Sequence, residues 1–106
     1  MHVEAGEVAR LGNLLLVKLW RGEASLLTIS PGGEVALGSD AEVVAAAEVP
    51  PGTGRMLGAR YLEMAGLEGA GEGRIELLFG ERGGASYAVE RTAEGQLRVR
   101  LVDRSA

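Results

Sequence analysis

Cysteine is absent from this 106-residue chain, histidine and lysine occur once each, and only 4% of the residues are aromatic. Without cysteine the chain has no disulfide, no zinc–thiolate site and no thiol nucleophile. His2 lies near the start of the sequence, where we expect a solvated side chain. A metal site or a general base built on it would lack a second imidazole or a thiol. We therefore expect neither a metal nor a cofactor.

Long apolar runs are also missing, because no stretch approaches the 18 or so residues that a membrane span requires. The opening stretch MHVEAGEVAR contains two Glu and no basic segment of the kind found in secretory signals, so we expect a cytoplasmic protein. The net charge of −4 disfavours attraction to phosphate backbones. Neither a membrane nor a nucleic acid is an expected partner.

The remaining composition is that of an ordinary globular protein, with 46% hydrophobic and 25% charged residues. This length fits one small domain, residues 1–106. Asn and Gln occur once each, and few amides together with many Arg and Glu are typical of a thermophile. A GC-rich genome would produce the same bias, so both interpretations stay open.

Alternation of apolar and polar residues predicts five strands. The clearest are 74–81 (RIELLFGE), 85–92 (ASYAVERT) and 96–103 (QLRVRLVD), joined by short glycine-bearing links. Residues 24–30 and 34–38 flank the turn sequence PGG and predict a hairpin. The fold class is therefore α+β, with an antiparallel sheet of about five strands.

One helix is predicted over 54–66, where apolar residues share a face and a glycine follows the last turn. Residues 7–20 have apolar residues at helical spacing, but Gly12 and Asn13 interrupt them. This segment is therefore either a helix or a buried strand. We expect one or two helices, covering one face of the sheet.

A short helix is a further expectation for residues 41–49, AEVVAAAEV. Ser39 and Glu42 have the spacing of a capping box at its start. Pro50 must end such a helix, because proline disfavours the helical conformation in the residue before it.

The sequence VPPGTGRM is similar to the phosphate loop of AAA-type ATPases. That chemistry needs an opening Gly, a Lys and a Ser or Thr, and Val49, Arg55 and Met56 stand in those places. Nucleotide hydrolysis is therefore not expected. A passive anion site at a helix start, formed by Thr53, Gly54 and Arg55, is the remaining hypothesis for this motif.

Catalysis has little support, because the 15 carboxylates fall mostly at turns or on outward strand positions and no serine has a GxSxG context. A small enzyme using carboxylates in a cleft stays the least favoured function. Arg98 and Arg100 form a basic stripe on one strand. We expect them to form a ladder of cross-strand ion pairs with Glu90 or Glu76 rather than to stack on nucleic-acid bases.

Apolar residues also occupy both faces of some predicted elements. Leu14 to Val17 are four in succession, and Leu77–Leu78 and Leu101–Val102 are adjacent pairs. A sheet with helices on one face leaves its other face open, and excess apolar surface there is typical of an interface. We therefore predict self-association, most simply as a homodimer.

Three stretches together resemble the roadblock, or dynein light chain, family. ASLLTISPGGEVAL is similar to the family's first hairpin, ARYLEMAG to the end of its central helix, and IELLFGERGGASYAVERTAEGQLRVRLVD to its terminal meander. The resemblance spans residues 7 to 103. Pro50 and Pro51 depart from it, because they interrupt what should be a long central helix.

This resemblance implies a non-enzymatic homodimer that pairs through the central helix and the strand after it, and that in some members holds a small GTPase. It implies dimer-face positions at Tyr61, Leu62, Ile75, Leu77 and Phe79. The predicted function is a self-associating protein-interaction module, a roadblock-type regulator or scaffold for a small GTPase. The alternative is a small-molecule or anion-binding protein that uses the PPGTGR turn.

Overall fold

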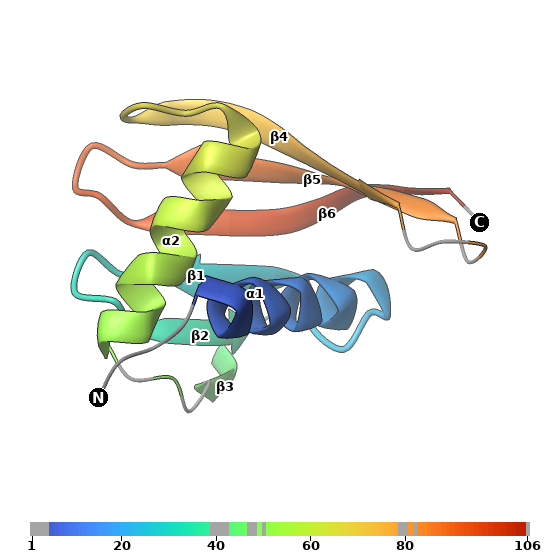
Figure 1. The fold of residues 1–106 in the computed structure, drawn as a ribbon, viewed down its shortest axis with the longest axis horizontal. Coiled ribbons are helices and arrows are strands. Elements are labelled where there is room, and N and C mark those ends of the chain that lie inside the picture. The colour runs from blue at the N-terminus through green and yellow to red at the C-terminus, as the bar shows by residue number, and fades with distance from the viewer. Residues whose placement is uncertain are drawn as a thin grey trace.

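A computed structural model describes residues 5–38, 43–46, 49, 51–78, 81 and 83–105. Its elements in chain order are α1 (Ala5–Trp20), β1 (Leu26–Ile29), β2 (Val35–Gly38), β3 (Val43–Ala46), α2 (Pro51–Ala65), β4 (Gly71–Leu78), β5 (Gly84–Arg91) and β6 (Leu97–Ser105). The strands form one six-stranded sheet in the order β3-β2-β1-β6-β5-β4, and every neighbouring pair is antiparallel. Both helices lie in front of this sheet in Figure 1.

The α+β class and the antiparallel sheet with helices on one face are confirmed. The five predicted strands correspond to β1, β2, β4, β5 and β6, with ends that differ by a few residues. For the predicted strand 74–81, the described part runs from Gly71 to Leu78, and Phe79 lies outside the described residues.

Residues 7–20 form a helix, which settles the alternative that the sequence left open. Gly12 is buried where α1 packs on α2, and a Cβ there would lie 3.3 Å from Leu57 and 3.5 Å from the Tyr61 hydroxyl. The glycine that weakens the helical pattern therefore allows the close approach of the second helix.

The expected short helix over 41–49 is wrong for residues 43–46, which form β3 and add a sixth strand beside β2. The β-branched Val43 and Val44 favour an extended backbone, and pairing with β2 satisfies the backbone polar groups on one side of the strand. Ser39, Glu42 and Pro50, on which the helix prediction also rested, lie outside the described residues.

Helix α2 begins at Pro51, three residues before the predicted start at 54. Proline is favoured in the first turn of a helix, because its missing N–H would have no helical partner there and its φ angle is already helical. Pro51 is therefore the first residue of α2, and the helix starts at this proline.

The core lies between the helices and the sheet. Its fully buried large side chains come from every layer and are Leu16, Leu19, Leu27, Leu57, Tyr61, Ile75, Tyr87, Val89 and Val99. Within the described residues, neither helix has both the length and the apolar character that a membrane crossing requires.

Two tyrosines join the layers through α1. The Tyr61 hydroxyl donates a hydrogen bond to the Gly12 carbonyl at 2.7 Å, and the Tyr87 hydroxyl donates to the Leu16 carbonyl at 2.7 Å. The acceptors are one helical turn apart, so α2 and the sheet bind successive turns of α1. Burial raises the pKa of Tyr87 to about 12, although Arg104 opposes the shift. Burial, with a smaller contribution from Tyr87, raises the pKa of Tyr61 well above its usual value.

Candidate functional site

The residues predicted to bind an anion lie in the first turn of α2, and each has a structural role there. Thr53, the third residue of α2, is buried. Gly54 packs against the backbone of Gly33, in the β1–β2 turn. Arg55 Nη1 donates a hydrogen bond to the Gly32 carbonyl at 3.0 Å, so its guanidinium is aimed at that turn. An anion site here would compete with this contact for Arg55.

Arg55→Ala therefore tests the anion hypothesis. We expect the free energy of unfolding to fall by about 1 kcal/mol or less, because the lost hydrogen bond is exposed. We expect the increase in melting temperature on adding inorganic phosphate to be the same as in the wild type. If phosphate raised the melting temperature of the wild type but not that of the variant, the result would support the anion site instead.

The roadblock resemblance places five residues at a dimer face. In the structure some of these are fully buried and others are partly buried at the edge of the core. Tyr61 and Ile75 are fully buried within the chain and expose no surface to a partner. Leu62 and Leu77 are partly buried against the same core. Phe79, like His2, lies outside the described residues. Of the described members of this set, only Leu62 and Leu77 have surface left to offer a partner.

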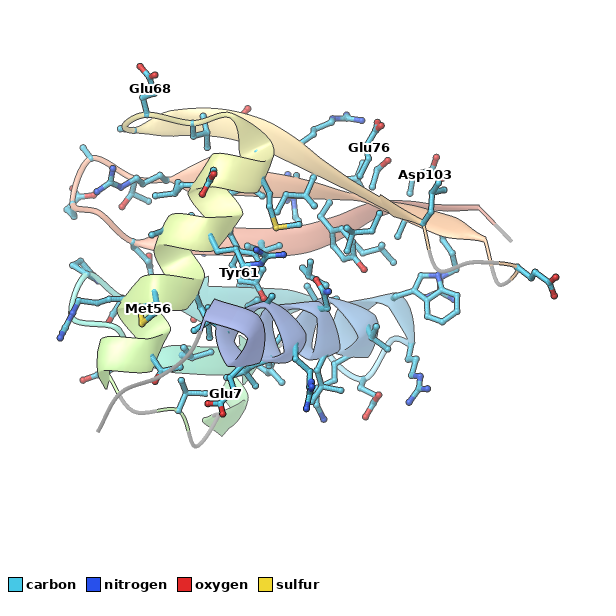
Figure 2. All side chains as sticks on the ribbon, in the orientation of Figure 1. Glu7, Met56, Tyr61, Glu68, Glu76 and Asp103 are labelled. Carbon is cyan, nitrogen blue, oxygen red and sulfur yellow. The ribbon has the colours of Figure 1, made fainter. Side chains whose placement is uncertain are left out.

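The face of the sheet away from the helices, here called the open face, carries ordered rows of charge. Strand pairing places Arg74 opposite Ala88 and Ala88 opposite Arg100, and these three residues are the arginine row. The same pairing aligns Glu76, Ser86 and Asp103, which are the acidic row. Figure 2 shows Glu76 and Asp103 on the part of the sheet that extends past the helices.

A third row contains Glu72, Glu90 and Arg98. Arg98 forms an ion pair with Glu90, at 3.8 Å between Nη1 and Oε1, as the cross-strand ladder predicts. Among the described residues, Arg74 and Arg100 have no carboxylate within ion-pair distance, so the cross-strand pair expected for Arg100 does not form. The open face thus carries two cationic side chains that form no ion pair with any described carboxylate.

A hollow of about 560 Å³ lies on the open face above the arginine row, and is called the open-face hollow. Arg74, Ala88 and Arg100 line it, together with the apolar side chains of Leu26 and Val102. Ala88 is small, so the space between the two arginines is not filled from below. The pairing of β5 with β6 shifts between Ser86 and Tyr87, and Val102 is the unpaired residue of this bulge.

The outer edge of β4 is the second feature of interest. β4 is the last strand of the sheet, and its eight residues pair only with β5 among the described residues. Glu72, Arg74 and Glu76 alternate on its open-face side, and Leu78 at its end is 88% exposed. Figure 1 shows this end of β4 extending beyond both helices. A long unpaired edge strand is a template for pairing with another chain.

The sequence did not predict the open-face hollow. The alternating arginines of β6 were visible, but the sequence does not show that Arg74 stands two strands away from Arg100 with only Ala88 between. The available signal was Ala88, a small uncharged residue at an outward position of the middle strand of the meander, between two strands that carry arginines at outward positions.

The described residues contain no group of three or more His, Asp or Glu side chains placed to hold a metal ion. The arrangement offers ion pairing, edge pairing and a partly apolar hollow. Comparison of the sequence with protein-family models and with curated proteins finds no match in either.

Proposed function

We propose that this protein is a self-associating interaction module in which two copies join through β4 into one continuous sheet. The observation that carries the proposal is the charge pattern on the free edge of β4, which is complementary to itself. This proposal agrees with the homodimer that the roadblock resemblance implies, and that resemblance suggests a small GTPase as a second partner.

The pairing follows from symmetry. When a two-fold axis relates two copies of an edge strand that pair in antiparallel fashion, residue i of one copy lies opposite residue j of the other. The sum of the residue numbers i and j is then the same for every facing pair. With Ile75 opposite its own copy, Arg74 faces Glu76 of the partner subunit, and the same contact forms a second time across the axis. This register overlaps residues 72–78, which is nearly all of β4.

Other registers that keep the helices of both copies on one face are less favourable. Centring the axis on Arg74 places this arginine opposite itself and Glu72 opposite Glu76. Centring it on Glu76 places that carboxylate opposite its copy. Like charges directly opposite each other are destabilising. An axis at Gly73 pairs Glu72 with Arg74 but overlaps only residues 71–75 of β4.

The favoured register also joins the rows of the open face. The acidic row of one subunit, with Glu76 at the edge, continues into the arginine row of the other, with Arg74 at the edge. Leu77, on the helix side of β4, comes opposite Gly73 of the partner subunit. Only the edge members Glu76 and Arg74 meet at the seam, which is the β4–β4 contact between the two copies, and their charges fix the register there more than they add affinity.

Charge reversal at the seam tests this proposal. Arg74→Glu and Glu76→Arg each place two pairs of like charges across the axis, so we expect each to weaken the dimer at least about tenfold. The double variant Arg74→Glu/Glu76→Arg restores unlike pairs and should restore dimerisation. Analytical ultracentrifugation over a concentration series measures the dissociation constants.

The fold should tolerate these changes, because Arg74 and Glu76 face the neutral Ala88 and Ser86 within the chain. Circular dichroism checks this. Arg100→Glu, two strands from the edge, is the matched control and should leave the dimer intact. A wild-type protein that stays monomeric at millimolar concentration, or a double variant as weak as the single ones, would rule out the β4 seam.

A further inference from the structure

We propose that the open-face hollow is a binding site for a small organic anion, one that carries a carboxylate or phosphate head and an apolar body. The juxtaposition of Arg74 and Arg100 around Ala88, beside Leu26 and Val102, carries this proposal. It is independent of the proposed seam, because the hollow is complete within one chain.

The head of such a ligand would lie between the two guanidinium groups. Neighbouring strands are about 4.8 Å apart, so Arg74 and Arg100 leave the sheet about 10 Å from each other, a span that two arginine side chains can close from both ends. Guanidinium groups bind carboxylate and phosphate oxygens through two parallel N–H donors. Because Ala88 ends at Cβ, its own side chain leaves the space between the two arginines open.

The third arginine of the hollow is already neutralised. Arg98 pairs with Glu90 at 3.8 Å, and both side chains are about half exposed. Glu72, the other carboxylate that lines the hollow, has no ion pair among the described residues. These carboxylates disfavour a ligand with several negative charges and leave one end of the hollow able to accept hydrogen bonds from a hydroxyl group.

The apolar body would lie on the β1 side of the arginine row. Leu26 on β1 and Val102 in the β6 bulge line that side, and Val102 is 44% exposed. A volume of about 560 Å³ lies within the range of small-molecule sites, roughly 300–1,000 Å³. A bare anion would leave this apolar surface uncovered, so the site favours an amphipathic ligand.

A dimer through β4 would keep this site. Glu76 of the partner subunit would approach Arg74 from across the seam, but a guanidinium has five N–H donors and can serve two acceptors. Arg100 is two strands from the edge, so its contribution does not depend on the oligomeric state.

Isothermal titration with four probes tests the proposal: octanoate, octyl phosphate, inorganic phosphate and 1-octanol. We expect octanoate or octyl phosphate to bind at one site per chain, at least about tenfold more tightly than inorganic phosphate or 1-octanol. The tighter of the two amphipathic probes identifies the head group as carboxylate or phosphate. Equal binding of inorganic phosphate or of 1-octanol would overturn the proposal, as would the absence of saturable binding of both amphipathic probes at about 10 mM.

Two variants with different mechanisms locate the binding. Arg100→Ala removes one guanidinium, and Ala88→Leu fills the hollow without changing the charge, so each should weaken the amphipathic probe at least about tenfold. Ala36→Leu places the same side chain on the open face of β2, outside the hollow, and should bind like the wild type. Wild-type affinity in both Arg100→Ala and Ala88→Leu would overturn the assignment, and ultracentrifugation of the same variants separates this outcome from a failure of the β4 seam.

Discussion

Gly54→Ala is expected to lower the free energy of unfolding by about 3 kcal/mol or more, although alanine is the better helix former. A Cβ at this position would overlap the carbonyl oxygen of Gly33, which belongs to the backbone. The backbone of the β1–β2 turn cannot move away easily, because two hydrogen bonds hold it. The Gly33 N–H is bonded to the Ser30 carbonyl at 2.9 Å, and Arg55 holds the Gly32 carbonyl at 3.0 Å. The first turn of α2 must therefore separate from the β1–β2 turn.

Gly52→Ala is the matched control, in the same turn of the same helix. The nearest atom to its new Cβ would be Arg55 Nη2 at 4.0 Å, so the substitution meets open space. We expect it to leave stability unchanged or raise it by up to about 1 kcal/mol. Urea denaturation with a constant m value measures both variants. If Gly54→Ala and Gly52→Ala have the same midpoint, the close packing of α2 on the β1–β2 turn is not part of the native structure.

The strands that the sequence predicted correctly are those with one covered and one open face. Leu97 and Val99 point to the helices while Arg98 and Arg100 point away, and this asymmetry produces the period-two pattern. β3 has no such pattern, because its sequence VVAA contains no polar residue. Its strand conformation depends on pairing with β2, which is a contact between segments that local sequence does not encode.

The helices show the same limit. Nothing near Gly12 in the sequence indicates that Tyr61, 49 residues later, needs the space and the carbonyl group of this position. The open-face hollow depends even more on long-range order, because it requires the strand order β6-β5-β4 and the register of both pairs. The predicted ladder between Arg98 and Glu90 was accessible from the sequence, since hairpin neighbours can be aligned by their turn.

Stability should fall steeply at alkaline pH because of the two tyrosines that bind α1. In the unfolded chain each phenol has a pKa near 10. Folding raises the pKa of Tyr87 to about 12 and that of Tyr61 further. Because the folded-state pKa values are the higher ones, this contribution is fully present below pH 10. It is lost as the pH rises through the folded-state values.

Each phenol that loses its proton only on unfolding contributes a slope of about 1.4 kcal/mol per pH unit. We therefore expect the free energy of unfolding to drop by roughly 4 kcal/mol between pH 9 and pH 11.5, a large fraction of the stability of a small domain. Urea denaturation at a series of pH values measures this slope. The measurement is made in the Lys18→Arg variant, which has no lysine, so that the change in stability with pH can be assigned to the tyrosines.

The double variant Tyr61→Phe/Tyr87→Phe separates this effect from general alkaline damage. It should be less stable than the wild type at pH 8 by about 2 kcal/mol, since two buried hydrogen bonds of 2.7 Å to the Gly12 and Leu16 carbonyls are lost. Its stability should then stay nearly constant up to pH 11.5, so that the two curves converge or cross. A double variant with the same alkaline slope as the wild type would show that these phenols do not stay protonated in the folded core. The hydrogen bonds that tie α1 to α2 and to the sheet would then have to be weaker than their geometry indicates.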